Sequence, residues 1–315
     1  MIALPLFGSS SFRFVAKGLI ELHRLGQAGK DDSPEAESVR DALDDPLRVL
    51  NRTEKERAGW LSADLYSVSE PPAASPLKEM TPPDQQQLIE AIKAEQNQEW
   101  DRALELLRRL QEHISPALLS SLRGSIWGES GYPEVAAFFH EHAWQTDKAN
   151  AKYHALYLDA LEESDPVAAE LLARQVLDDV ETYDPLVVAH AARIHFHDSG
   201  VTPGWDVAQM CQRLIPILER NAMRIEGSGK DISRSVVYGM TVQTLGICYD
   251  LQGNSIAAID CFSRGLLANP NNIGLLVYRG ILRYGRGDEP LLTLSKPNDL
   301  AIPMCCPTCF WHTTA

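Results

Sequence analysis

The sequence predicts an all-α protein in which antiparallel helix pairs stack as a solenoid, preceded by a short helical N-terminal segment. Two observations lead to this prediction. Small residues recur along the chain at a period near 33 residues, and within a period a second small residue follows the first after 12, as Ala258 follows Gly246. Such periodicity is typical of helical repeats, in which each unit buries its apolar face only against its neighbours.

Composition limits the function classes. The 315 residues have 44% hydrophobic content and 23% charged content, close to the averages of globular proteins. The net charge of −14 repels phosphate backbones, so we expect no nucleic-acid partner and instead a basic or apolar protein or peptide. We also expect no membrane partner, because the chain has neither a signal-peptide pattern nor an apolar run long enough to span a bilayer.

The six cysteines indicate a reducing compartment. Cys211, Cys248 and Cys261 lie in expected helices at spacings that suggest no disulfide framework. Reduced thiols are the rule in the cytosol, so we expect a cytoplasmic protein.

The N-terminal segment, residues 1–66, predicts three helices. The first, over 11–26, is amphipathic and packs on its neighbours, with a membrane-surface helix as the alternative. The second begins at Ser33, a good N-cap followed by proline and glutamate, and is expected to reach about Asp45 before Pro46 perturbs it. The third begins near Thr53.

Residues 67–84 contain five prolines and few apolar residues, which predicts an extended linker and a domain boundary. Helix pairs then follow over 85–287. Small residues mark the expected crossings at Ala103, Ala136 and Ala168, and the register loosens after Pro185, where one repeat is longer than the others.

The clearest repeat is 239–272. Its spaced positions are Val242, Leu245, Gly246, Tyr249, Ala258, Phe262 and Pro270. Gly246 and Ala258 allow two helices to cross closely, and Pro270 ends the second helix because its ring cannot continue the backbone ladder. This repeat strongly resembles the tetratricopeptide (TPR) pattern, with Val242 in place of the leading tryptophan, and the rest of 85–287 resembles it more weakly.

The resemblance implies that a partner segment lies in a concave groove lined by the first helix of each pair. The corresponding groove positions are Gln243, Ile247 and Asp250 in the clearest repeat, and Val277, Ile281 and Tyr284 in the next. Family members that clasp a carboxylate use Lys, Asn and Arg at such places, and this sequence departs from them. A mixed apolar and acidic groove is the better expectation.

Residues 288–315 form an irregular tail rich in cysteine and proline. Three prolines interrupt the expected second helix of the last repeat, so a covering segment must come from the tail, from a second chain or from residues beyond the sequence. An aberrant C-terminus is a further alternative. The tail's Cys305, Cys306, Cys309 and His312 are soft ligands, but they lie too close together for an ordinary zinc site. A redox Cys-x-x-Cys lacks its usual strand and helix, so we expect no metal and no cofactor.

No catalytic motif is recognised. His190, His195 and His197 lack the i, i+4 pairing of metalloproteases, His140 and His142 alternate across a helix, and no phosphate loop or nucleophile elbow occurs. The leading hypothesis is therefore a non-catalytic interaction scaffold. The alternatives are self-association, through the N-terminal helices or the uncapped C-terminal end, and an enzyme whose residues converge from separate helices.

Overall fold

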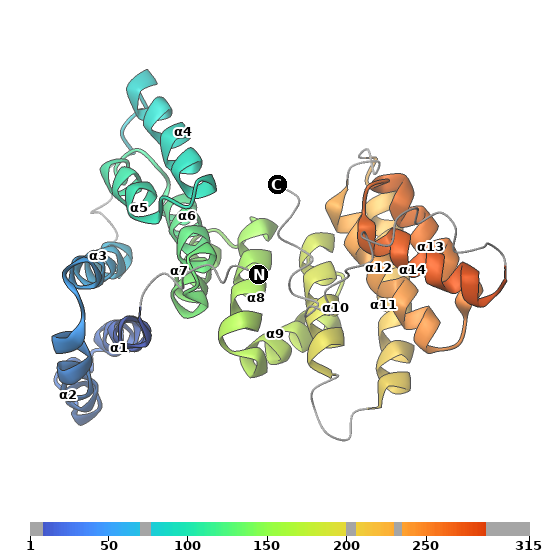
Figure 1. The fold of residues 1–315 in the computed structure, drawn as a ribbon, viewed down its shortest axis with the longest axis horizontal. Coiled ribbons are helices and arrows are strands. Elements are labelled where there is room, and N and C mark those ends of the chain that lie inside the picture. Colours follow the sequence, from blue (N-terminus) through green and yellow to red (C-terminus); the bar gives the residue numbers. More distant parts are fainter. Residues whose placement is uncertain (1–8, 70–76, 200–205, 230–234, 288–315) are drawn as a thin grey trace. The chain divides into compact units, whose positions relative to one another are not determined.

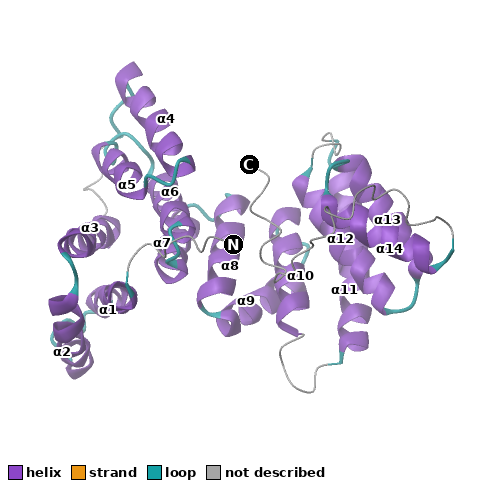
Figure 2. Cartoon of the chain, in the orientation of Figure 1, coloured by secondary structure: helices purple, strands orange, loops and turns teal. Residues whose placement is uncertain are grey.

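The computed structural model describes residues 9–69, 77–199, 206–229 and 235–287. In these ranges the chain forms fourteen α-helices and no strand (Figures 1 and 2). The predicted all-α fold of paired helices is confirmed. The helices are α1 (Ser10–Gln27), α2 (Pro34–Val49), α3 (Arg52–Ser69), α4 (Pro82–Gln96), α5 (Trp100–Arg109), α6 (Pro116–Glu129), α7 (Pro133–Thr146), α8 (Ala151–Ser164), α9 (Pro166–Asp178), α10 (Pro185–Ser199), α11 (Val207–Glu226), α12 (Val236–Leu251), α13 (Ser255–Ala268) and α14 (Ile273–Gly285).

Short polar residues fix where many helices begin. Ser33 accepts a hydrogen bond from the amide of Ala36 at 3.2 Å, and Pro34 occupies the first helical position. Thr81 and Asp84 form a capping box at α4. The expected interruption at Pro46 is wrong, because α2 continues through Pro46 to Val49. So close to the helix end, the proline removes only one backbone hydrogen bond.

The chain divides into two compact units, Met1–Leu172 and Ala173–Ala315, with the boundary inside α9. In the first unit, α1 packs against α2, α3 and α7, and the pairs α4/α5 and α6/α7 follow. One hydrophobic core joins helices from both sides of residues 67–84: the ring of Phe12 lies 6.3 Å from that of Trp127 and 5.2 Å from that of Tyr132. The predicted segment boundaries stay predictions, and this shared core was not part of them.

The small residue of the third crossing is Ala169 rather than the predicted Ala168. Ala169 is fully buried, whereas Ala168 is half-buried. The correction makes the step from Ala136 equal to 33 residues, the same as the step from Ala103. Ala103 and Ala136 are buried as predicted.

In the second unit, α11 packs on α12, α12 on α13 and α13 on α14. The α12/α13 pair is the clearest predicted repeat, and a polar cluster joins it to α11. The Tyr238 hydroxyl donates to Glu226 at 2.6 Å, and Arg264 donates to the same carboxylate at 2.6 Å and to the Tyr238 oxygen at 3.0 Å. The helices of this unit are therefore connected by polar contacts as well as by apolar packing.

Candidate interaction surface

The predicted groove residues lie on α12 and α14. Gln243, Ile247 and Asp250 are half-buried on α12. On α14, Val277 is half-buried, whereas Ile281 is 58% exposed and Tyr284 is 54% exposed. Residues three and four apart share one face of a helix, so each trio is presented together. Their role in binding stays a prediction.

The two helices meet the same residue of α13. A Cβ on Gly265 would lie 2.9 Å from a methyl group of Val242 on α12 and 2.7 Å from one of Leu275 on α14. Ile247 packs against the buried cluster of Ala258, Phe262, Leu266 and Leu275. Ile247 therefore contributes to packing, while Ile281 and Tyr284 present the more accessible apolar surface.

The residues expected to shape the repeat have two different environments. Leu245, Gly246, Ala258 and Phe262 are buried between α12 and α13. Tyr249 is half-buried, and its hydroxyl donates to Glu219 of α11. Pro270 is exposed and comes two residues after the end of α13.

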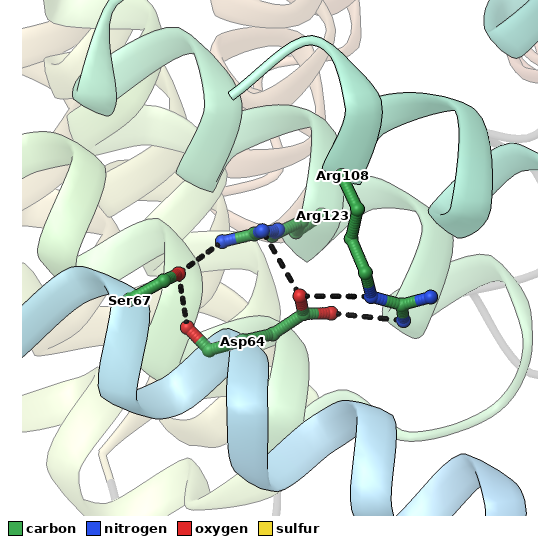
Figure 3. A network of polar contacts seen from close by, with 4 residues as sticks. All are labelled: Asp64, Ser67, Arg108 and Arg123. Atoms are coloured by element: carbon green, nitrogen blue, oxygen red, sulfur yellow. Dashed lines mark hydrogen bonds and ion pairs between the residues drawn. The ribbon is translucent and has the colours of Figure 1, made fainter. Parts of the chain in front are cut away.

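A buried ionic network in the first unit was not found from the sequence. Asp64 of α3 receives Nε and an Nη of Arg108, both at 3.1 Å, and lies 2.9 Å from an Nη of Arg123 (Figure 3). Ser67 accepts a hydrogen bond from Arg123 at 2.8 Å and donates one to the Asp64 backbone carbonyl at 2.7 Å. The side chains of Asp64 and Arg123 are 2% and 1% exposed.

This network ties α3 to α5 and α6. The Arg108 guanidinium also lies over the Trp60 ring, 4.9 Å from its centroid. Burial lowers the pKa of Arg123, and the nearby Asp64 carboxylate opposes that shift. Because both oxygens of Asp64 face guanidinium groups, the carboxylate is held as a structural counter-ion and is poorly suited to accept a proton from a substrate.

A serine and a histidine lie within hydrogen-bond distance in the same unit. The Ser120 hydroxyl is 2.9 Å from Nδ1 of His142. Burial lowers the pKa of His142. Ser120 is fully buried, so no substrate reaches its hydroxyl without displacement of α6 or α7. The pair connects these two helices.

The cysteines that the structure describes, Cys211, Cys248 and Cys261, are buried free thiols. Burial raises the pKa of Cys261 to about 11, which keeps it protonated at neutral pH. No group of His, Cys, Asp or Glu in the described ranges could hold a metal ion. The tail ligands at 305–312 lie outside those ranges.

Membrane spanning can be assessed from the described helices alone. None of them combines the length and the apolar content needed to cross a bilayer.

Comparisons with known proteins add one fold likeness. No protein-family model matches the sequence, and no curated protein matches it. Among solved structures, the chain is similar to the crystal structure of the P58(IPK) TPR domain, with 16% sequence identity over 88% of this chain and 70% of that chain. The TM-score is 0.30, and we base no argument on a likeness of this degree.

Proposed function

We propose that this protein is a non-catalytic, TPR-like scaffold that binds a segment of another protein against the groove faces of α12 and α14. One observation carries the proposal. Ile281 and Tyr284, at the groove positions of α14, are large apolar side chains that are each more than half exposed. Adjacent exposed side chains of this kind are typical of binding surfaces.

The environment of the ionisable groups supports a binding function over an enzymatic one. Asp64 is held by two arginines, Ser120 is buried beneath its histidine, and Glu226 is held by Tyr238 and Arg264. We also propose a cytoplasmic location, because the described cysteines are free thiols of the kind that a reducing compartment maintains.

The test compares the chain with two charge-introducing variants. Partners are captured from the native source with the unaltered chain, Ile281→Glu and Tyr284→Glu, and a captured protein is then titrated against each purified chain. A buried carboxylate in the interface should weaken binding about tenfold or more. Ile247→Glu should also weaken it, but Ile247 packs inside the repeat, so a thermal melt must accompany that variant.

Leu267→Glu is the matched control. Leu267 is 78% exposed and lies in the same unit on α13, away from the predicted groove positions. We expect its partner list and affinities to equal those of the unaltered chain. Equal binding by Ile281→Glu and Tyr284→Glu would refute the groove. A concentration-dependent mass in light scattering that these substitutions abolish would instead favour self-association.

A further inference from the structure

The face of α12 that packs on α13 has a counterpart on α14. On α12 this face contains Leu245, Gly246 and Tyr249, and the ring of Phe262 fills the space above the glycine: a Cβ on Gly246 would come within 2.5 Å of it. Thirty-four residues later, the equivalent positions on α14 are Arg279, Gly280 and Arg283. Together with Leu276, the counterpart of Val242, these residues define what we call the end face.

The end face is exposed at its centre. Gly280 is exposed, and a Cβ placed there would meet no atom within 4 Å. Leu276 is 42% exposed beside it. The end face therefore repeats the glycine that receives a ring in the preceding pair, but no ring fills it.

The charge of the end face differs from that of its counterpart. Arg279 and Arg283 stand where α12 has Leu245 and Tyr249, and α14 with its C-cap also includes Arg286 and no acidic residue. The chain as a whole has a net charge of −14. A basic face on an acidic protein attracts an acidic partner and weakens pairing with a cation.

The sequence that follows α14 lacks the side chain that this face would receive. Phe262 comes sixteen residues after Gly246, and the residue sixteen after Gly280 is Lys296, followed by Pro297. A lysine would bring a third cation to Arg279 and Arg283. A symmetric pair of end faces from two copies would likewise oppose arginine to arginine, since a two-fold interface uses the same patch twice.

We propose that the end face docks an acidic amphipathic helix of another protein, which places an aromatic side chain over Gly280 and carboxylates beside Arg279 and Arg283. This surface is separate from the proposed groove. Val277, Ile281 and Tyr284 lie on a different side of α14, because at 100° per residue their mean direction is roughly 120° from that of the end face. The inference goes beyond the proposed function and does not depend on it.

The probe is a phage-displayed library of helical peptides, selected on the full chain and counter-selected on Gly280→Leu. We expect enriched peptides to have one central aromatic residue and acidic residues one turn to either side. The best peptide, labelled with fluorescein, is then titrated by anisotropy. Gly280→Leu, which fills the slot, and Arg279→Glu should each raise its Kd about tenfold or more.

Gly59→Leu is the matched control. Gly59 is an exposed helical glycine of α3, and a Cβ there also meets nothing within 4 Å. Leucine favours a helix over glycine at both positions, so both variants should fold. The peptide's Kd should stay within about twofold for Gly59→Leu and for Ile281→Glu, which separates this test from that of the groove.

Four results would overturn the proposal: no enrichment over the counter-selected chain, enrichment of basic peptides, an unchanged Kd for Gly280→Leu, or tighter binding of a labelled DNA duplex than of any peptide. A dimer in sedimentation velocity that Gly280→Leu abolishes would show that the occupant is a second copy. Peptide binding that rises about tenfold when residues 288–315 are removed would assign the face to the chain's own tail.

Discussion

The ring of Phe262 on α13 lies over Gly246 of α12, so closely that a Cβ on the glycine would stand 2.5 Å from the ring's Cε1. The first unit has the same arrangement: a Cβ on Gly124 of α6 would stand 2.7 Å from Cε1 of His140 on α7. In both pairs the ring follows the glycine by sixteen residues. The glycine is therefore needed for the depth at which the second helix packs on the first.

Gly246→Ala should destabilise the protein despite the better helix propensity of alanine. The added methyl group overlaps a buried ring, and overpacking of this kind costs about 1–3 kcal/mol, against a gain of about 1 kcal/mol from propensity. Urea denaturation should show a lower midpoint. Combining the change with Phe262→Leu should restore part of the loss relative to Phe262→Leu alone, because the clash is then relieved.

Gly239→Ala is the control on the same helix. A Cβ at Gly239 meets no atom within 4 Å, so only propensity changes, and we expect the unfolding free energy to rise by about 0.5–1 kcal/mol. If both substitutions moved the midpoint in the same direction, contact with Phe262 would not be the reason for the glycine.

The helix pairs could be predicted because their signal is local and repeats. Glycines, alanines and breaking residues recur at fixed spacing, and their physical role is the same in each repeat. The position of His140 was also readable, since it follows Gly124 by the same sixteen residues that separate Phe262 from Gly246. It was missed because the two histidines of α7 were considered only as metal ligands.

The Asp64 network could not be predicted in the same way. Arg108 is 44 residues from Asp64, and Arg123 is 59 residues from it, on two other helices. Helical periodicity identifies the face on which a residue lies but not the partner opposite it. The groove residues have the same limit, because their exposure is a property of the fold and their ligand is a property of another molecule.

Asp64→Asn should be strongly destabilising. It leaves Arg123, whose side chain is 1% exposed, without its buried counter-charge, and removing one partner of a buried ion pair costs about 3–5 kcal/mol. Replacing both partners, as in Asp64→Leu with Arg123→Met, should recover much of this loss, because no uncompensated charge then stays buried. Thermal and urea denaturation of the single and double variants measure the difference.

The comparison needs an exposed ion pair as its control. Arg52 bonds to Glu56 at 3.0 Å with a side chain that is 93% exposed, and Arg52→Ala should leave the denaturation midpoint unchanged. An Asp64→Asn variant that unfolded at the same urea concentration as Arg52→Ala would contradict a structural role for the network.

Acid should weaken the protein through its buried histidines. Burial lowers the pKa of His140 and of His154 to about 4, although the Asp159 carboxylate opposes the shift at His140. A histidine in the unfolded chain has a pKa near 6.5, so between pH 6.5 and 4 the unfolded state binds more protons than the folded state. The unfolding free energy therefore falls as the pH is lowered through this window, by about 1.4 kcal/mol per histidine at pH 5.5.

His140→Phe isolates one of these contributions. Phenylalanine has a precedent in this position, because Phe262 lies over Gly246 in the same relationship, so the variant should fold with its α6/α7 packing kept. Urea denaturation at pH 7.5 and pH 5.5 should show a loss of stability on acidification that is smaller by about 1.4 kcal/mol than in the unaltered chain. Equal losses in the two proteins would mean that His140 takes up its proton while folded, and the ring over Gly124 would then have to be reached by water.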